Sequence, residues 1–179
     1  MTVPAPLAPD SYWVEPGKFL AGEYPGHKDD TAARQKLGAL LDAGIQVFVD
    51  LTEPGEYGLR PYEAMLDEAR PAGAALAYHR LPIRDISVPT TSRMRQILSL
   101  IDESLKADRP VYVHCWGGTG RTGTVVGCWL VEQGRAGADP IEALRPLRRD
   151  CKKRDRRSPD THQQEDFVRA WARPEGSEA

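Results

Sequence analysis

The chain has 179 residues, of which 40% are hydrophobic and 28% are charged, a composition typical of one folded domain of ordinary size. Its 24 Lys and Arg residues are balanced by 26 Asp and Glu residues, and a net charge of −2 excludes a protein that binds nucleic acid through a basic excess. No apolar run reaches the ~18 residues of a membrane span, so we expect neither a nucleic-acid partner nor a membrane partner.

The first residues and the cysteines indicate the compartment. The start of the chain, MTVPAPLAPD, has three prolines and lacks the basic and continuous apolar regions of a secretory signal. We expect an extended lead-in over residues 1–10, a single domain over 11–173 and a short tail over 174–179. Three cysteines are too few for a disulfide framework and favour a reduced, cytoplasmic protein.

The first half of the chain predicts a hairpin followed by alternating helices and strands. Short β-like segments over 12–14 and 19–21 flank a turn signal, Pro16-Gly17. A helix is predicted over 30–43 because its leucines share one face and Gly44 suits the C-cap. The later elements are a strand over 45–51, a loop over 53–62, a short helix over 63–70 and a strand over 75–81.

The second half continues the alternation. Ser92 is the predicted cap of a helix whose apolar residues, from Met94 to Leu105, follow steps of three, four and seven. Asp139-Pro140 and Ser158-Pro159 are predicted to open two more helices, because proline suits the first helical position. The elements are a strand over 111–114, a glycine-rich turn over 115–120 and helices over 121–133, 140–149 and 159–172. The order predicts an α/β fold with one mostly parallel sheet and helices on both faces.

The residues from His114 to Gly123 form the most informative stretch, His-Cys-Trp-Gly-Gly-Thr-Gly-Arg-Thr-Gly. Cys115 follows a predicted strand, and the glycines after it let the backbone turn its N–H groups inward at the start of a helix. Such a ring of amides binds anions, and Arg121 adds a planar fork that fits two oxygens of a phosphate. The positive field there favours a thiolate at Cys115, so the loop predicts a nucleophile that attacks phosphorus.

Two other kinds of loop have related chemistry. A nucleotide-binding loop needs Gly-x-x-x-x-Gly-Lys-Ser/Thr, whereas Arg121 stands before Thr122 and the loop has no lysine. A sulfur-transfer loop also has a cysteine after a strand, but it does not require the Arg-Thr-Gly continuation. A sulfurtransferase or an arsenate reductase that uses the same thiolate stays open as an alternative.

The pattern His-Cys-x-x-Gly-x-x-Arg-Thr-Gly resembles the signature of the cysteine-based protein tyrosine phosphatase superfamily, and the length is similar to that of its compact dual-specificity branch. The resemblance implies a catalytic domain over 11–173 with a phosphate loop between the last central strand and a helix. It implies a phosphomonoester hydrolase that acts through a phosphocysteine intermediate, without a metal or other cofactor. The phosphate-binding residues are then Trp116, Gly117, Gly118, Thr119, Gly120 and Arg121.

The reaction also needs a general acid, because an unprotonated leaving oxygen departs slowly. The family keeps an aspartate on a mobile loop about thirty residues before the cysteine, and Asp85 lies at that distance, between Pro82 and Pro89. Asp50 is the runner-up, since it closes a strand but has no such loop around it. An acid and a thiolate that titrate in opposite directions predict a bell-shaped activity profile with an optimum at about pH 5–6.5.

Three residues beside the nucleophile have roles that the resemblance implies. The Thr122 hydroxyl is expected to hydrogen-bond the Cys115 sulfur and help it to leave in the second step. His114 either orients the loop through its imidazole or is a buried structural histidine. Trp116 offers a loop N–H, and its ring either walls the phosphate site or packs in the core.

A segment near the C-terminus resembles the Gln-Thr-x-x-Gln motif that positions the hydrolytic water in tyrosine-specific relatives. Only Gln164 matches a glutamine of that motif, and Asp160 stands where the first glutamine would be. Gln164 is therefore the candidate for positioning water, while the alternative is that Ser158 simply caps a helix that packs on the core. Tyr57 or Tyr62 is expected to flank the phosphate site.

The substrate is less clearly indicated. Residues 145–157 hold eight basic and two acidic residues, which indicates a solvated face or attraction of a polyanion such as an acidic phosphopeptide, an inositol phosphate or RNA. Cys128 is expected in the core, and Cys151 is a candidate redox partner of Cys115. The expected partner is a phosphorylated protein or small molecule. The alternatives are a phosphatase of inositol phosphates or other small molecules, and a phosphate-binding pseudophosphatase module.

Overall fold

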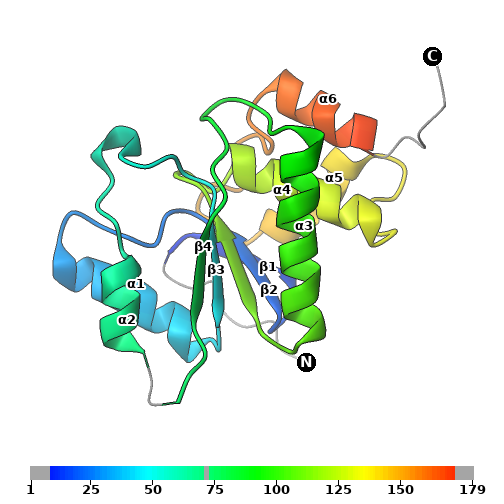
Figure 1. The fold of residues 1–179 in the computed structure, drawn as a ribbon. Coiled ribbons are helices and arrows are strands. Elements are labelled where there is room, and N and C mark those ends of the chain that lie inside the picture. Colours follow the sequence, from blue (N-terminus) through cyan, green and yellow to red (C-terminus); the bar gives the residue numbers. More distant parts are fainter. Residues whose placement is uncertain (1–8, 71–72, 172–179) are drawn as a thin grey trace.

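The computed structural model describes residues 9–70 and 73–171, and in it five strands form one sheet in the order β1-β2-β5-β3-β4 (Figure 1). Apart from Pro9 and Asp10, the expected lead-in over 1–10 lies outside the described residues, as do positions 172–173 and the expected tail over 174–179. The sheet begins with the predicted hairpin, because β1 (Ser11–Glu15) and β2 (Phe19–Gly22) are antiparallel. The other neighbours, β5 (Val111–His114), β3 (Val47–Asp50) and β4 (Ala77–Arg80), run parallel to β2, which confirms the predicted mostly parallel sheet.

Successive side chains of the central strands point to opposite faces of the sheet, and both faces are buried under helices. On one face, Phe48 and Tyr112 pack with α1 (Asp30–Asp42) and α2 (Glu63–Ala69). On the other face, the valines of β3 and β5 pack with α3 (Thr91–Lys106), α4 (Gly120–Glu132), α5 (Pro140–Leu144) and α6 (His162–Trp171). Figure 1 shows the two helical layers on opposite sides of the sheet.

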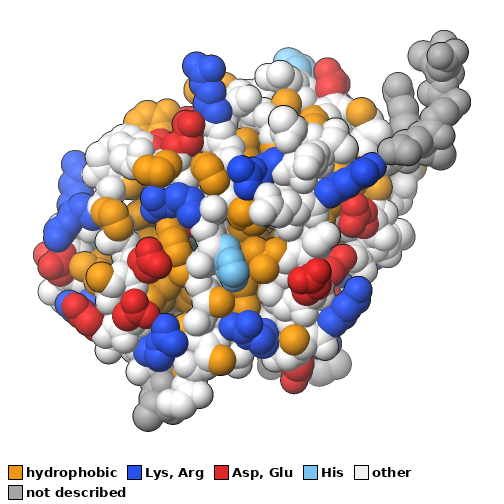
Figure 2. All heavy atoms as spheres, viewed as in Figure 1, with side chains coloured by type: hydrophobic (Ala, Val, Ile, Leu, Met, Phe, Trp, Pro, Cys, Tyr) orange, Lys and Arg blue, Asp and Glu red, His pale blue; other side chains and the backbone are white. Residues whose placement is uncertain are grey.

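The strand β4 forms one edge of the sheet, and its side chains are only half-buried. Figure 2 shows the corresponding face of the molecule, on which hydrophobic atoms reach the surface among interspersed basic and acidic side chains. Within the described residues, no helix is long and apolar enough to cross a bilayer.

The structure corrects two predicted details of the helices on the α3 side. Thr90 rather than Ser92 caps α3, because the Thr90 hydroxyl accepts a hydrogen bond from the Arg93 amide. The helix predicted over 140–149 ends at Leu144, and a 3-10 turn, η2 (Pro146–Arg148), follows it. A proline has no amide hydrogen to continue the α-helical ladder, which explains the break.

The last helix also begins later than predicted. Ser158 does not cap it, because the Ser158 hydroxyl donates to the carbonyl of Thr119 at 2.8 Å. The helix α6 begins at His162, and Thr161 accepts a hydrogen bond from the amide of Gln164. The Ser-Pro pair therefore joins the segment before α6 to the loop after β5, and it does not start a helix.

The carboxyl ends of β3 and β5 lie side by side, with Asp50 opposite His114 in the strand register. The loop after β5 leads directly into α4, whose residues from Gly120 to Leu130 are all buried between the sheet and the neighbouring helices. Ligands of parallel α/β sheets bind at this edge, beyond the carboxyl ends of the strands. The fold therefore places the cysteine loop where such sheets hold their ligands.

Candidate active site

The loop from Cys115 to Thr119 connects β5 to the N-terminus of α4. The Cys115 side chain is buried, and the amide of Gly118 donates a hydrogen bond to its sulfur across 3.3 Å. The free N–H groups and the dipole of a helix favour negative charge at its N-terminus. The sulfur therefore lies inside the loop, at the N-terminal end of α4.

Gly118 has a backbone conformation that the loop needs and that other residues rarely adopt, with φ of +75°. A Cβ atom at this position would lie 2.6 Å from the carbonyl carbon of Gly22 and 2.7 Å from the amide of Glu23. The end of β2 thus presses against the loop, and glycine is the residue that fits both the torsion angle and the space.

Arg121 lies almost entirely buried in the first turn of α4, and carboxylates surround its guanidinium. It donates to both carboxylate oxygens of Glu56, at 2.6 and 2.7 Å, and to the carbonyl of Ile83 at 3.0 Å. Burial opposes its charge, but the hydrogen bonds to Glu56 and the negative charges of Cys115, Glu56 and Asp85 raise the pKa of Arg121 above its usual value. A permanent positive charge is thus fixed beside the Cys115 sulfur.

Asp85 lies in the connection between β4 and α3, and it reaches the same cluster. Its Oδ1 atom is 3.0 Å from the Arg121 guanidinium, and its Oδ2 atom accepts a hydrogen bond from the Tyr57 hydroxyl at 2.5 Å. The Asp85 side chain keeps 30% of its surface exposed, so its carboxylate is accessible from solvent. The structure therefore brings together Cys115, Arg121 and Asp85, which lie far apart along the chain.

Asp50, the runner-up acid, is placed in a different environment. Its carboxylate is fully buried and accepts hydrogen bonds from the amide and hydroxyl of Thr52 and from the Tyr78 hydroxyl. Burial raises its pKa, but the neighbouring His114 and the hydrogen bonds from Thr52 and Tyr78 outweigh burial and lower it. A carboxylate that is saturated with hydrogen bonds and stays ionised is a structural anchor, which favours Asp85 as the acid.

His114 is buried behind the loop and connects it to the aromatic side chains on the α1 face. Its Nδ1 atom is 3.2 Å from the Cys115 carbonyl, and its Nε2 atom is 2.6 Å from the Tyr62 hydroxyl. Burial lowers the pKa of His114, so the imidazole stays neutral. These contacts fit the expected role of orienting the loop, and they place Tyr62 inside the molecule and not at the mouth of the phosphate site.

The structure gives the Thr122 hydroxyl a different partner from the expected one. It donates to the carbonyl of Gly22 at 3.4 Å, while the neighbouring Thr119 hydroxyl donates to Asp160 at 3.0 Å. In this state Thr122 fastens the start of α4 to β2, and its proposed help to the leaving sulfur requires a change of hydrogen-bond partner.

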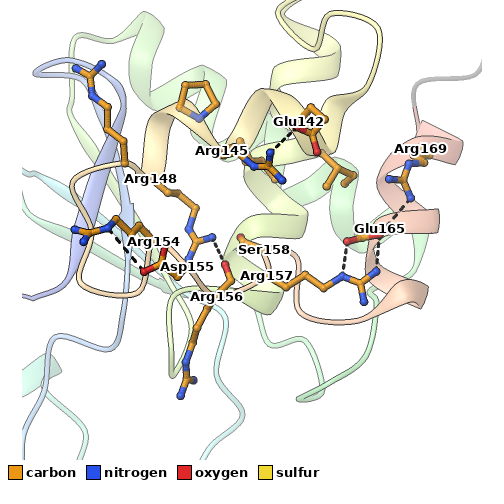
Figure 3. Close-up of a pocket in the computed structure, with 14 residues that line it drawn as sticks. Glu142, Arg145, Arg148, Arg154, Asp155, Arg156, Arg157, Ser158, Glu165 and Arg169 are labelled. Carbon is orange, nitrogen blue, oxygen red and sulfur yellow. Dashed lines mark hydrogen bonds and ion pairs between the residues drawn. The ribbon is translucent and has the colours of Figure 1, made fainter.

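Gln164 braces the Asp85 loop. Its Nε2 atom donates to the carbonyl of Ser87 at 3.1 Å, and its Oε1 atom accepts from the amides of Asp160 and Thr161. Close by, Ser158 holds the carbonyl of Thr119, as described above; Figure 3 shows Ser158 beside the Arg157–Glu165 ion pair. The start of α6 is therefore joined to both the phosphate loop and the Asp85 loop.

Three large hydrophobic side chains stay exposed in the described part of the chain: Tyr57, Ile86 and Trp116. All three belong to or adjoin the segments that form the site. The rings of Tyr57 and Trp116 contact each other, with centroids 5.3 Å apart. Of the two tyrosine candidates, Tyr57 therefore flanks the site, and Trp116 contributes its ring to the rim.

Glu56 is the site residue that sequence reasoning missed. It lies in a 3-10 turn, η1 (Glu56–Gly58), after Gly55, which has φ of 75°. Nothing in the local sequence distinguishes it from other loop glutamates, because its partner Arg121 lies 65 positions away. Over residues 9–70 and 73–171, no three His, Cys, Asp or Glu side chains come together as metal ligands.

Comparisons with known proteins agree with this geometry. A family model described as "Tc-R-P: Polymorphic toxin system, DSP-PTPase phosphatase" matches residues 23–135, which include the whole cysteine loop and Asp85. The chain is 36% identical over 88 residues to the uncharacterized protein MJECL20 of Methanocaldococcus jannaschii, a match that covers 49% of this chain and 54% of that protein. It is also 30% identical over 128 residues to the dual specificity protein phosphatase CDC14A of Homo sapiens, covering 70% of this chain and 20% of that protein.

Among solved structures, the crystal structure of Tk-PTP in the active form matches with a TM-score of 0.69 and 22% identity, over 93% of this chain and 98% of that chain. The sheet, its two helical layers and the cysteine loop thus define a phosphatase-type α/β fold. The chain belongs to the cysteine-based protein tyrosine phosphatase superfamily, in its dual-specificity-like branch. The alignments span about half the length of the first curated relatives that it matches.

Proposed function

We propose that this protein hydrolyses phosphomonoesters through a phosphocysteine intermediate. One observation carries the proposal most strongly: the sulfur of Cys115 lies within a loop of backbone amides, and Arg121 and Asp85 adjoin each other across 3.0 Å beside it. The family match supports the same chemistry. A phosphate that enters the loop would meet a nucleophile, a fixed positive charge and an acid at once.

In the first step, the Cys115 thiolate attacks phosphorus, a sulfur–phosphorus bond forms and the ester oxygen–phosphorus bond breaks. Asp85 gives its proton to the departing oxygen, so the alcohol or phenol leaves neutral. The loop amides and Arg121 stabilise the charge on the remaining phosphate oxygens. His114 keeps the loop in shape through the carbonyl of Cys115.

In the second step, water attacks the phosphocysteine and the sulfur–phosphorus bond breaks. Asp85 now takes the proton from water, inorganic phosphate leaves and the thiolate is restored. Gln164 is our candidate for positioning the water, because it holds the loop of Asp85 through Ser87. Thr122 is the candidate hydroxyl for stabilising the leaving sulfur.

The cysteines also support a reducing, cytoplasmic setting for the reaction. All three are unpaired thiols. Burial raises the pKa of Cys128 and of Cys151, the latter to about 11, so neither is prepared to react. We therefore assign catalysis to Cys115 and treat Cys128 as a core residue.

The proposal is tested by replacing the nucleophile. Cys115→Ser should lower the hydrolysis of para-nitrophenyl phosphate by more than about a thousandfold, because a serine hydroxyl stays protonated, while tungstate or phosphate still binds in the loop. Cys128→Ala is the matched control, since it removes another buried thiol, one that lies within α4 and not in the loop. Substantial turnover by Cys115→Ser would disprove the mechanism, and an inactive wild-type protein that still binds phosphate would favour a binding module.

A further inference from the structure

A groove of about 560 Å³ opens directly beside the phosphate loop. Trp116 and Gly117, the two residues that follow Cys115, form one of its walls. The other walls come from the connection between β2 and α1, from the residues after η1 and from the basic segment, defined as residues 145–157. We call this space the basic groove.

Cationic side chains dominate the basic groove. Five of them line it: Lys28, Lys36, Arg60, Lys153 and Arg156. Two carboxylates offset this charge, since Glu23 is shared by Lys36 at 3.3 Å and Lys153 at 2.7 Å, and Asp30 pairs with Arg60 at 2.8 Å.

The five cations of the groove therefore outnumber the carboxylates that pair with them. Across residues 9–70 and 73–171, neither Lys28 nor Arg156 has a carboxylate partner. Positive side chains that outnumber the carboxylates in a concave surface indicate a site for an anion.

The wall that carries Lys153 and Arg156 is held in place by hydrogen bonds. Lys153 donates through its ammonium to the carbonyl of Gly117 at 3.0 Å, which ties the basic segment to the phosphate loop. The buried Arg148 donates to the carbonyls of Lys153 and Arg156, both at 2.8 Å. The groove is thus built into the fold and adjoins the loop that holds Cys115.

A larger neighbouring pocket of about 970 Å³ is also rich in arginine, but its charges are used internally (Figure 3). Arg157 and Arg169 share Glu165, and Arg145 pairs with Glu142 at 3.3 Å. In Figure 3 the Arg156 side chain extends away from Arg145 and Glu142. Ion pairs within the protein therefore use most of the charge of that arginine cluster, whereas the basic groove keeps cations without a carboxylate partner.

We propose that the basic groove binds a second phosphate of the substrate whose first phosphate enters the Cys115 loop; this rests on the proposed function. Consecutive Cα atoms lie about 3.8 Å apart, so Gly117 is within roughly 7.6 Å of Cys115. The groove therefore begins close enough to Cys115 for one small molecule to enter both the loop and the groove. The preferred substrates are therefore polyphosphorylated sugars or polyols, and the exposed rings of Tyr57 and Trp116 border the space between the two anion sites.

The experiment compares matched substrates on the full chain. Phosphate release is measured from fructose bisphosphate against fructose monophosphate, and from inositol hexakisphosphate against inositol monophosphate, with para-nitrophenyl phosphate as the reference. The wild-type protein should show a KM about tenfold lower for the polyphosphate of each pair. The double variant Lys28→Ala/Arg156→Ala should raise the KM of the polyphosphates about tenfold, leave their kcat within about twofold and change the reference little.

The control removes the same charge elsewhere. Lys18→Ala/Lys106→Ala takes two exposed lysines from segments that do not line the groove, so it reproduces any effect of net charge alone. Equal KM changes in both double variants, or equal changes for monophosphates and polyphosphates, would overturn the second site. An acidic phosphopeptide is measured in parallel, and a KM effect of the groove variant confined to that peptide would also overturn the second site. A wild-type protein that does not hydrolyse para-nitrophenyl phosphate at all would instead refute the proposed function. Failure of the second site and failure of the proposed function are therefore distinguishable.

Discussion

The side chains of Arg121 and Asp85 are held beside Cys115 by contacts with distant parts of the chain. Arg121 is fixed by both oxygens of Glu56 and by the carbonyls of Leu51 and Ile83, at the ends of two strands. Bidentate pairing of this kind fixes the orientation of a guanidinium as well as its charge. Asp85 completes the cluster from the other side. The Asp85 carboxylate is thereby held beside a permanent positive charge.

The roles of the two aspartates can be separated by isosteric replacement. Asp85→Asn should lower kcat by about 10²–10⁴-fold and remove the alkaline limb of the pH profile, because the amide cannot donate the proton to the leaving oxygen. Asp50→Asn should leave the shape of the profile unchanged and lower the free energy of unfolding by about 1–3 kcal/mol, since it disrupts buried hydrogen bonds. The measurements are kcat against pH and denaturant unfolding. An Asp85→Asn enzyme with an unchanged profile would remove Asp85 from the mechanism.

Some site residues could be predicted from the sequence, and others could not. Cys115 and Arg121 carry a compact local pattern, and Asp85 stands at a recognisable separation from it. Glu56 and Lys153 reach the loop only through contacts between distant segments, which depend on the strand order and on the path of the basic segment. Residue types in a single sequence do not contain that information.

At the scale of elements, the loop depends on three neighbouring pieces of chain that hold its backbone. The end of β2 presses on Gly118, the start of α6 holds the carbonyl of Thr119 through Ser158, and Lys153 holds the carbonyl of Gly117. A loop that closes around an anion must keep its amides pointing inward, and these contacts restrict the alternatives. The helix starts show the limit of prediction at this scale, because Ser158 has the local features of a cap but bonds to a distant carbonyl.

The tight contact at Gly118 predicts a large effect of one methyl group. Gly118→Ala should lower kcat/KM by about 100-fold or more, because the added Cβ must displace either the loop or the end of β2, and small displacements of reacting groups are costly. Gly134→Ala is the control, since Gly134 also has a positive φ, of 65°, but a Cβ there would contact nothing within 4 Å. The control should cost about 1–2 kcal/mol of stability from the strained torsion and keep full activity. Similar activity losses in both variants would contradict the proposed steric reason.

At the scale of the whole molecule, the layered architecture was predictable because the alternation of strands and helices permits few arrangements. The buried polar cluster that connects the two helical layers was not. His114 links Tyr62, on the α1 face, to the cysteine loop, and Asp50 lies 4.0 Å from its ring. The site is therefore supported by buried ionisable side chains.

The neutral state of His114 predicts how stability depends on pH. Burial lowers the pKa of His114 despite the neighbouring Asp50 carboxylate, so the unfolded chain, with an ordinary value of about 6.5, binds a proton that the folded chain does not. The free energy of unfolding should therefore fall as the pH decreases below about 6.5, by at most about 1.4 kcal/mol per pH unit. The lowered pKa values of Glu23, Asp50 and Glu165 act only in more acidic solution, below 4.5.

The measurement is denaturant unfolding between pH 7.5 and 5.5, with nuclear magnetic resonance titration of the imidazole as a second readout. His162→Gln, which replaces an exposed histidine, should keep the slope, and His114→Gln should remove it if the variant folds. A free energy of unfolding that stays constant over this range, or an imidazole that titrates normally in the folded protein, would contradict the assignment.

The most direct test of the central claim is to trap the intermediate on the sulfur. The wild-type protein is mixed rapidly with para-nitrophenyl phosphate, quenched in acid within the first turnover and analysed by peptide mass spectrometry. The account predicts one phosphoryl group on the peptide that contains Cys115, formed at least as fast as steady-state turnover and absent from Cys115→Ser. Rapid turnover with no phosphoryl group on Cys115 at any quench time, or with the group on another residue, would contradict it.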